Sequence, residues 1–426
     1  MSIDALKEFC RHGTPLYIYG AGGYGRIIKA FLEECDIVVA GFVETARGEH
    51  TRQVMGIPVL SLEELHGEGY FIVGVGKDYE GEIVERLQAC GVGEYFLLPE
   101  GLIDLLYRSV HFSASKPIKN NFVNILLYHR IAAHVSDPWN MKVTPEHFEE
   151  HIRYVKEHYP VLRFEDDWAE VREPSVVITF DDGYFDNYVT ALPILEKYQV
   201  PATIFVSTGY IGNRTMFWWD CLEKLVASGQ DFPSAVEIGG FLVELYRTEN
   251  VCRGDREGIL RQIQNALKLL LPSQREAILQ DLKDRLERAF FESNRDRAIS
   301  VVELKKMADS PYITIGGHTV THSMLSIEPE DLQRWELTES KRRIEEIIER
   351  PVEVLSYPFG SRKDIAEVTP SIAQECGYKK AAANWRGTVG DWTDPFLLPR
   401  NSQRDCSTED FARKLRGTWY MYADES

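Results

Sequence analysis

Two clusters of residues in this sequence could do chemistry, and the first is the hexapeptide TFDDGY at positions 179–184. Its adjacent carboxylates, Asp181 and Asp182, follow the β-rich run SVVITF and precede a glycine. Neighbouring strand residues point to opposite faces, so one acid could bind a metal ion while the other moves protons. An Asp-Gly turn with a solvated acid is the common alternative, and the hexapeptide alone does not exclude it.

The second cluster is the pentapeptide HTVTH at positions 318–322, which follows the apolar run YITIGG. A spacing of four places His318 and His322 on one face of a helical turn, where two neutral imidazoles suit Zn²⁺. For such a pair alone, a capping or core role is the default interpretation. Together with Asp182, the histidines form a ligand set that leaves one coordination position open for water or substrate.

Both clusters follow strands in a repeated pattern of short β-rich runs and helical stretches. The runs NILLYHRI, SVVITF, ATIFVS, YITIGG and VEVLSY alternate with stretches such as 146–158 and 330–350. This alternation predicts a barrel or an open α/β sheet. Residues 221–309 differ, because apolar residues at helical spacing face charged ones, which predicts an inserted helical subdomain. A lid or packing role is favoured for it, and gripping the substrate is the alternative.

Taken together, TFDDGY and HTVTH resemble the polysaccharide deacetylase (NodB homology) family of metal-dependent carbohydrate esterases. The resemblance implies a distorted (β/α) barrel with Asp181 as the general base. It also implies that Asp182, His318 and His322 hold Zn²⁺, or another divalent ion such as Co²⁺, Ni²⁺ or Mn²⁺.

The segment YPFG at 357–360 resembles the family motif that walls the substrate groove, although Ser356 stands where the family often has an arginine. A backbone N–H near Tyr184 would stabilise the oxyanion, and Trp392 could line the acetyl group. The resemblance therefore implies these substrate-binding residues: Tyr184, Tyr357, Pro358, Phe359, Gly360 and Trp392.

The usual family carries its general acid, a histidine, late in the domain, but no histidine follows His322 here. The run ILLYHR at 125–130 resembles the same strand and histidine moved to the front, as in circularly permuted members that deacetylate biofilm poly-N-acetylglucosamine. The resemblance implies His129 as the acid, with a core histidine as the alternative. It also suggests Arg400 as the arginine that orients the catalytic aspartate; an ordinary ion pair is equally open.

The N-terminal part, from residue 15 to 98, alternates β-rich and helical segments and predicts a Rossmann-like parallel sheet. The run GAGGYG at 20–25 fits GxGxxG, follows the strand LYIYG and opens a helix, so its amides could meet a phosphate. The candidate binding residues are Gly20, Gly22, Gly25 and, at the end of the next strand, Glu44. Close packing of helix on sheet is the other use of such glycines.

This N-terminal part resembles the corresponding domain of sugar acyltransferases of sialic-acid and bacterial-glycan synthesis, through YGAGGYGR, GFVE and GIPVLSLEEL. The resemblance implies a domain at 1–117 that engages nucleotide sugar, followed by a deacetylase-like domain at 118–426. The hexapeptide repeats of those acyltransferases are missing, so an empty scaffold or a homo-oligomerisation domain is equally credible.

Composition excludes several classes of function. With 426 residues, 44% hydrophobic and 27% charged, the chain should fold into more than one globular domain. Its net charge of −18 disfavours nucleic acid and anionic lipid as partners. No apolar window is long enough for a membrane span and no secretion signal is recognised, so we expect a cytoplasmic protein. The seven scattered cysteines argue against a disulfide framework.

The leading hypothesis is a metal-dependent N-deacetylase that acts on an N-acetylated amino sugar in bacterial surface polysaccharide synthesis. The sugar could be nucleotide-, lipid- or glycan-linked. A nonhydrolytic module that binds glycan or nucleotide sugar through a degenerate esterase site is the runner-up. An NAD-dependent oxidoreductase rests on the glycine motif alone.

Overall fold

The computed structural model describes residues 2–12, 15–44, 53–73, 77–99, 102–103, 105–106, 121–133, 137–212, 216–227, 235–238, 241–244, 253–285, 296–390 and 393–422. The chain divides into two compact units, Met1–Asn121 with Arg413–Ser426, and Phe122–Ala412. The division falls within helix α13 (Thr408–Tyr422). The predicted boundary between residues 117 and 118 lies outside the described residues.

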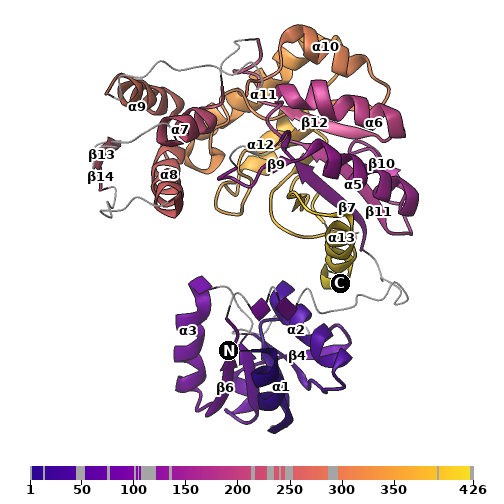
Figure 1. Ribbon diagram of the computed structural model, residues 1–426, viewed down its shortest axis with the longest axis vertical. Coiled ribbons are helices and arrows are strands. Elements are labelled where there is room, and N and C mark those ends of the chain that lie inside the picture. The colour runs from indigo at the N-terminus through magenta and orange to yellow at the C-terminus, as the bar shows by residue number, and fades with distance from the viewer. Residues whose placement is uncertain are drawn as a thin grey trace. The chain divides into compact units, whose positions relative to one another are not determined.

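The first unit contains a six-stranded sheet in the order β3-β4-β2-β1-β5-β6 (Figure 1). All its described pairs are parallel except β3 with β4. The strands are β1 (Leu16–Tyr19), β2 (Gly41–Glu44), β3 (Gln53–Val54), β4 (Ile57–Ser61), β5 (Tyr70–Val73) and β6 (Glu94–Leu97). The helical elements are α1 (Ile3–His12), α2 (Gly23–Glu34), η1 (Glu63–Leu65) and α3 (Lys77–Ala89). The predicted parallel sheet with crossover helices is confirmed.

Both faces of this sheet are covered, as is usual for parallel sheets. On one face, Ile18 and Phe42 pack with apolar residues of α1 and α2, such as Phe31. On the other face, Tyr19 and Val43 belong to a separate buried cluster that includes residues of α3. Short β-branched and aromatic strands between amphipathic helices produce this two-sided burial.

Helix α2 approaches β1 very closely at Gly25. A Cβ added to Gly25 would lie 1.8 Å from the carbonyl oxygen of Gly20 and 3.2 Å from the ring of Phe42. Gly20 itself has φ +98°, which strains any residue with a side chain. These two glycines are therefore required by the backbone geometry at the start of α2.

The second unit is built on a strongly curved sheet in the order β17-β16-β15-β12-β11-β7-β18 (Figure 1). Its strands are β7 (Asn121–Tyr128), β11 (Ser175–Phe180), β12 (Ala202–Val206), β15 (Ile313–Gly317), β16 (Val354–Ser356), β17 (Lys380–Ala382) and β18 (Val389–Gly390). Short strands β10 (Val161–Leu162) and β19 (Asn401–Ser402) pair in parallel with β11 and β7, and β8 (Arg130–Ile131) pairs with β9 (Lys142–Val143). The accompanying helical elements are α5 (Pro145–His158), η2 (Asn187–Ala191), α6 (Leu192–Tyr198), α10 (Val301–Asp309), η3 (Leu325–Ile327), α11 (Glu330–Ile348) and α12 (Thr369–Glu375).

The segment that carries Arg400 connects β17, at one end of this curved sheet, with β7, which lies next to the other end. Leu398 forms a parallel bridge with Ala382 of β17, and Asn401 aligns with Leu126 of β7. The interior is filled by apolar residues from the strands, including Phe205. The sheet thus curls into a distorted barrel, as predicted from the sequence.

The helical insertion differs in two respects from the expected range of 221–309. It contains helices α7 (Trp218–Ala227), α8 (Arg253–Lys268) and α9 (Pro272–Arg285), and an antiparallel hairpin, β13 (Ala235–Ile238) with β14 (Phe241–Glu244), lies between α7 and α8. Helix α10, which the expected range included, instead packs against β15 and α11. Among the described residues, no helix is long and apolar enough to cross a membrane.

Replacing Gly25 with Ala should destabilise the first unit by about 3 kcal/mol, because the new methyl group meets backbone that cannot move aside. The control is Gly81→Ala in α3, where a Cβ meets nothing within 4 Å and helix propensity should add about 0.5–1 kcal/mol of stability. Urea denaturation of both variants measures the difference. Equal effects of the two substitutions would contradict the close approach of α2 to β1.

Candidate active site

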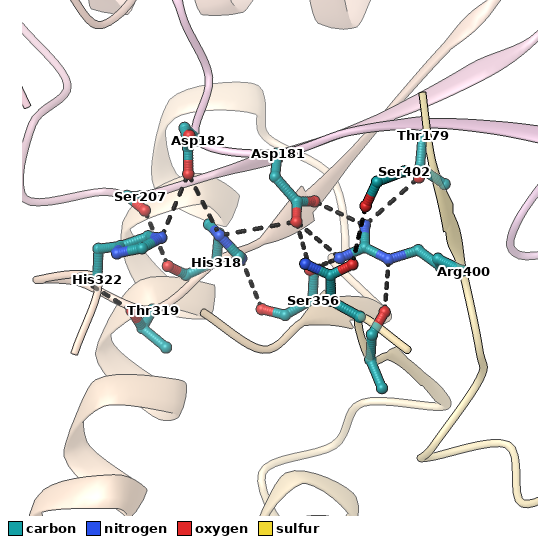
Figure 2. A network of polar contacts seen from close by, with 12 residues as sticks. Thr179, Asp181, Asp182, Ser207, His318, Thr319, His322, Ser356, Arg400 and Ser402 are labelled. Carbon is teal, nitrogen blue, oxygen red and sulfur yellow. Dashed lines mark hydrogen bonds and ion pairs between the residues drawn. The ribbon is translucent and has the colours of Figure 1, made fainter. Parts of the chain in front are cut away.

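The two adjacent acids diverge at a sharp turn after β11. Asp182 has φ +74° and Gly183 has φ +81°, so the chain leaves the extended conformation directly after Asp181. A Cβ on Gly183 would lie 2.7 Å from a methyl group of Val206, which explains the glycine. Asp182 points toward the two histidines and Asp181 toward Arg400 (Figure 2).

Asp182, His318 and His322 converge on one point. The Nε2 atoms of His318 and His322 lie 3.4 and 3.3 Å from Oδ1 of Asp182, and all three residues are buried. One ligand atom from each lies within 4.8 Å of the others, so the group could hold a metal ion. Two imidazole nitrogens and one carboxylate oxygen form a donor set that fits Zn²⁺ and related divalent ions.

The loop at 318–322 is not the helical turn that the spacing predicts. It continues from β15 as irregular backbone, with φ +62° at Thr319 and +53° at His322. The amide of His322 donates to Oγ1 of Thr319, and the amide of Thr208 donates to the Thr319 carbonyl. Backbone geometry after the strand, rather than helical periodicity, therefore brings the two imidazoles together.

Glu336 of helix α11 anchors this loop, and the sequence analysis missed it. Its buried carboxylate accepts hydrogen bonds from the amides of Val320 and Thr321 at 2.7 and 3.0 Å, and from the Thr321 hydroxyl at 2.5 Å. Nothing in the local pattern distinguishes Glu336, because α11 carries many other acids.

The two histidines have different surroundings. Nδ1 of His318 lies 2.7 Å from the carbonyl oxygen of Ser356, so it donates there and leaves Nε2 as the free nitrogen. Burial favours the neutral form of His318, but the carboxylates of Asp181 and Asp182 outweigh it and raise its pKa. Burial dominates at His322 and lowers its pKa to about 4.

Asp181 forms a buried, two-pronged ion pair with Arg400. Nη1 and Nη2 of Arg400 lie 2.7 and 2.6 Å from Oδ1 and Oδ2 of Asp181, and the Ser356 hydroxyl donates to Oδ2 at 3.1 Å (Figure 2). Burial alone would raise the pKa of Asp181, but Arg400 and His318 reverse this and lower it. The carboxylate is therefore ionised at neutral pH.

His129 follows β7 directly and is half-buried. Its carbonyl oxygen accepts a hydrogen bond from Nδ2 of Asn187 at 2.8 Å. When protonated, His129 would add to the closer partners that lower the pKa of Asp181 and Asp182. The structure thus places its ring within electrostatic reach of both acids.

The side chain of Tyr184 is fully buried and packs with residues of the inserted helices. Its hydroxyl donates to Oδ2 of Asp220 at 2.9 Å and accepts from Nε1 of Trp219 at 2.7 Å. The part of the chain that the structure describes offers no hydrogen-bond acceptor to its backbone N–H. If Tyr184 binds substrate, it therefore does so through its backbone N–H and not through its side chain.

The YPFG segment lies beside the histidines, where Phe359 packs its ring 4.8 Å from that of His322. Phe359 and Gly360 have φ +60° and +68°, so the chain turns sharply there. Tyr357 and Pro358 are buried. The last of the six predicted substrate-binding residues, Trp392, lies outside the described residues.

The four predicted N-terminal binding residues are brought together within the first unit. Gly20, Gly22 and Gly25 lie between the end of β1 and the first turn of α2, and Glu44 ends the neighbouring strand β2. Their arrangement matches the expected strand, glycine-rich turn and helix. The close approach at Gly25 accounts for one of the three glycines through packing.

Comparison with known proteins assigns both units. Residues 169–234 and 275–381 match the polysaccharide deacetylase family, and residues 15–79 match the PglD N-terminal domain. The chain carries a polysaccharide deacetylase domain. The resemblances that the sequence motifs suggested are thereby confirmed.

The similar proteins include the putative polysaccharide deacetylase YxkH of Bacillus subtilis, 35% identical over 152 residues, or 33% of this chain and 52% of that protein. Poly-beta-1,6-N-acetyl-D-glucosamine N-deacetylase of Staphylococcus aureus is 31% identical over 112 residues, or 25% of this chain and 38% of that protein. The chain thus spans about half or less of these relatives. The crystal structure of a putative polysaccharide deacetylase from Bacillus anthracis aligns at 19% identity and TM-score 0.45, covering 70% of this chain and 69% of that one.

Replacing Glu336 with Ala should lower the free energy of unfolding by about 2–4 kcal/mol, because the buried amide of Val320 and the part-buried amide of Thr321 lose their acceptor. The loosened loop should also weaken zinc binding about tenfold or more. Chemical denaturation and zinc competition titration measure the two effects. The matched control is Glu346→Ala on the exposed face of the same helix, and a Glu336 variant that behaves like it would contradict the anchoring role.

Proposed function

We propose that this protein is a metal-dependent hydrolase that removes N-acetyl groups from an amino sugar in bacterial surface polysaccharide synthesis. The convergence of Asp182, His318 and His322 beside the ion-paired Asp181 carries the proposal. These residues come from distant segments of the chain, and a structural role alone does not require two buried imidazoles around one carboxylate.

A divalent cation bound by Asp182, His318 and His322 would supply Lewis-acid polarisation of the acetamide carbonyl and of a water nucleophile. The three donors would leave room for oxygen ligands from substrate and water. Nδ1 of His318 donates a hydrogen bond to the Ser356 carbonyl, so Nε2 of His318 is the nitrogen free to bind a metal ion.

Asp181 takes the proton from the attacking water. It meets the first requirement for this role, because the Arg400 guanidinium keeps its carboxylate ionised and holds it in one orientation. Arg400 is itself positioned by a hydrogen bond from Nε to the carbonyl of Ala383 at 2.8 Å. Asp181 therefore binds no metal in this proposal but faces the same reaction centre as Asp182.

The backbone N–H of Tyr184 stabilises negative charge on the acetamide oxygen, which fits its lack of an acceptor among the described residues. His129 donates a proton to the departing amine. Its half-buried ring and its electrostatic reach to both acids support this assignment. Acetate and a free amino sugar are the products.

The substrate class rests on the relatives. The Staphylococcus aureus proteins are named for N-deacetylation of poly-beta-1,6-N-acetyl-D-glucosamine, so an N-acetylated hexosamine is the proposed target. Whether it is nucleotide-, lipid- or glycan-linked is open to a direct substrate screen. The match to the PglD N-terminal domain makes nucleotide-linked N-acetyl sugars the first compounds to include.

Chelation should abolish acetate release from an N-acetylated sugar, and added Zn²⁺ should restore it. The variant His318→Ala should stay inactive even with excess zinc, because one of three ligands is gone. A matched control is His147→Ala on α5. His147 and His151 have the same spacing as His318 and His322, but they form hydrogen bonds with Asp405 and Cys406. Persistent activity of His318→Ala would refute the metal site, and metal-free protein with intact sugar affinity would favour the nonhydrolytic module.

The variant Asp181→Asn separates the roles of the two acids. It should lower kcat by about a hundredfold or more, since a proton acceptor is lost, while zinc content stays at the wild-type level. Elemental analysis and acetate-release kinetics on the same preparation make the comparison. Loss of zinc with Asp181→Asn would instead mean that Asp181 is the ligand and Asp182 the base.

A further inference from the structure

The inserted helical segment reaches the metal site through Trp219 in the first turn of α7. The Trp219 ring lies 4.4 Å from the ring of His322, at an interplanar angle of 50°. Only 4% of Trp219 is exposed, so its faces are not free to stack on a sugar. A tryptophan from the insertion therefore packs directly on a candidate metal ligand.

His322 depends on such packing more than His318 does. His318 has a carbonyl partner at Nδ1, whereas Nδ1 of His322 is buried and has no hydrogen-bond partner among the described residues. Instead, the His322 ring contacts the rings of Trp219 and Phe359, with centroids 4.4 and 4.8 Å away. A metal-binding histidine usually has a polar partner on its second nitrogen, which fixes the ring orientation. At His322 the described residues provide contacts with aromatic rings instead of a polar partner for Nδ1.

Trp219 is itself held rigidly. Its Nε1 donates to the Tyr184 hydroxyl at 2.7 Å, and that hydroxyl donates to Asp220, the next residue of α7. Phe217 stacks on Trp219 with ring centroids 4.8 Å apart and an interplanar angle of 11°. A side chain fixed on this many sides can restrict the motion of its neighbour.

A buried charge cluster fastens this part of the insertion to the barrel. Arg130, two residues after β7, pairs with Asp186 at 2.9 Å and with Asp296 at 2.7 Å, and lies 3.9 Å from Asp220. The Arg130 guanidinium also lies 4.5 Å from the centre of the Tyr184 ring. The start of α7 is thus tied to the strand end that carries His129.

We infer that Trp219 is a positioning residue for the metal centre: with Phe359 it clamps the imidazole of His322, so metal affinity depends on the helical insertion. The inference rests on the proposed metal-dependent function but assigns the insertion a task that a lid or a sugar-gripping element would not have. It requires no contact between Trp219 and the substrate.

The test compares zinc affinity in Trp219→Met and Trp219→Phe, measured by competition with a chromogenic chelator. Met keeps most of the volume but loses the flat ring, and the dissociation constant for zinc should rise about tenfold. Phe keeps a ring against His322 and should stay within about threefold of wild type. At saturating zinc, KM for the sugar should be unchanged in both variants.

The matched control is Trp168→Met. The Trp168 indole N–H also donates a hydrogen bond, in this case to the Arg163 carbonyl oxygen at 3.0 Å, and its ring packs on Phe164. This variant should lose stability but keep wild-type zinc affinity. Should Trp219→Met fail to fold, Phe359→Met removes the other ring and should weaken zinc binding severalfold.

Wild-type zinc affinity in Trp219→Met, or in Phe359→Met if that substitute is needed, would overturn the inference. A raised KM with unchanged zinc affinity would also overturn it and assign Trp219 to the substrate instead. If the wild-type protein binds none of zinc, cobalt(II), nickel(II) and manganese(II), the proposed metal-dependent function itself is refuted. The two failures are therefore distinguishable.

Discussion

Two adjacent carboxylates are buried at the end of one strand, and the rest of the site follows from the need to balance them. A buried carboxylate is costly unless it is paired, and two neighbours also repel each other. The turn at Asp182 and Gly183 separates them. Asp181 receives a guanidinium and a hydroxyl, while Asp182 receives two imidazoles. As a result, the negative charge of Asp181 is balanced by Arg400, and the carboxylate of Asp182 is available to bind a cation.

The curvature of the sheet makes the ion pair between Asp181 and Arg400 possible. Arg400 lies on the last segment before α13, between a bridge to β17 and the short pairing with β7. Because the sheet curls, this short segment contacts both β17 and β7 and projects the Arg400 side chain toward the end of β11. Ser356, at the end of β16, then contacts Arg400, Asp181 and His318 together.

The sequence allowed prediction of those residues whose type and spacing indicate a chemical role. The motifs pointed to the paired acids, the paired histidines and Arg400, which the structure brings together, and the role of His129 stays a prediction. The alternating pattern predicted both parallel sheets. The missed features depend on long-range packing. Glu336 is one acid among many on α11, and the significance of Ser356 appears only once β16 is placed beside β15. The positive φ angles of the histidine loop leave no periodic signal, so the predicted helical turn was wrong.

The Arg130 cluster bears on how the insertion could have been acquired. Asp220 lies in the first turn of α7 and Asp296 follows α9 in sequence, and both lie near a guanidinium buried at the barrel's own strand end. Excising residues 218–296 would remove both of these carboxylates and leave Asp186 as the remaining acidic partner of Arg130 in this cluster, in a medium that solvates ions poorly. The inserted helices and Arg130 therefore depend on each other energetically. We expect a related protein without these helices to carry a different residue at position 130, and we expect a transfer of the helices into another barrel to require the arginine as well.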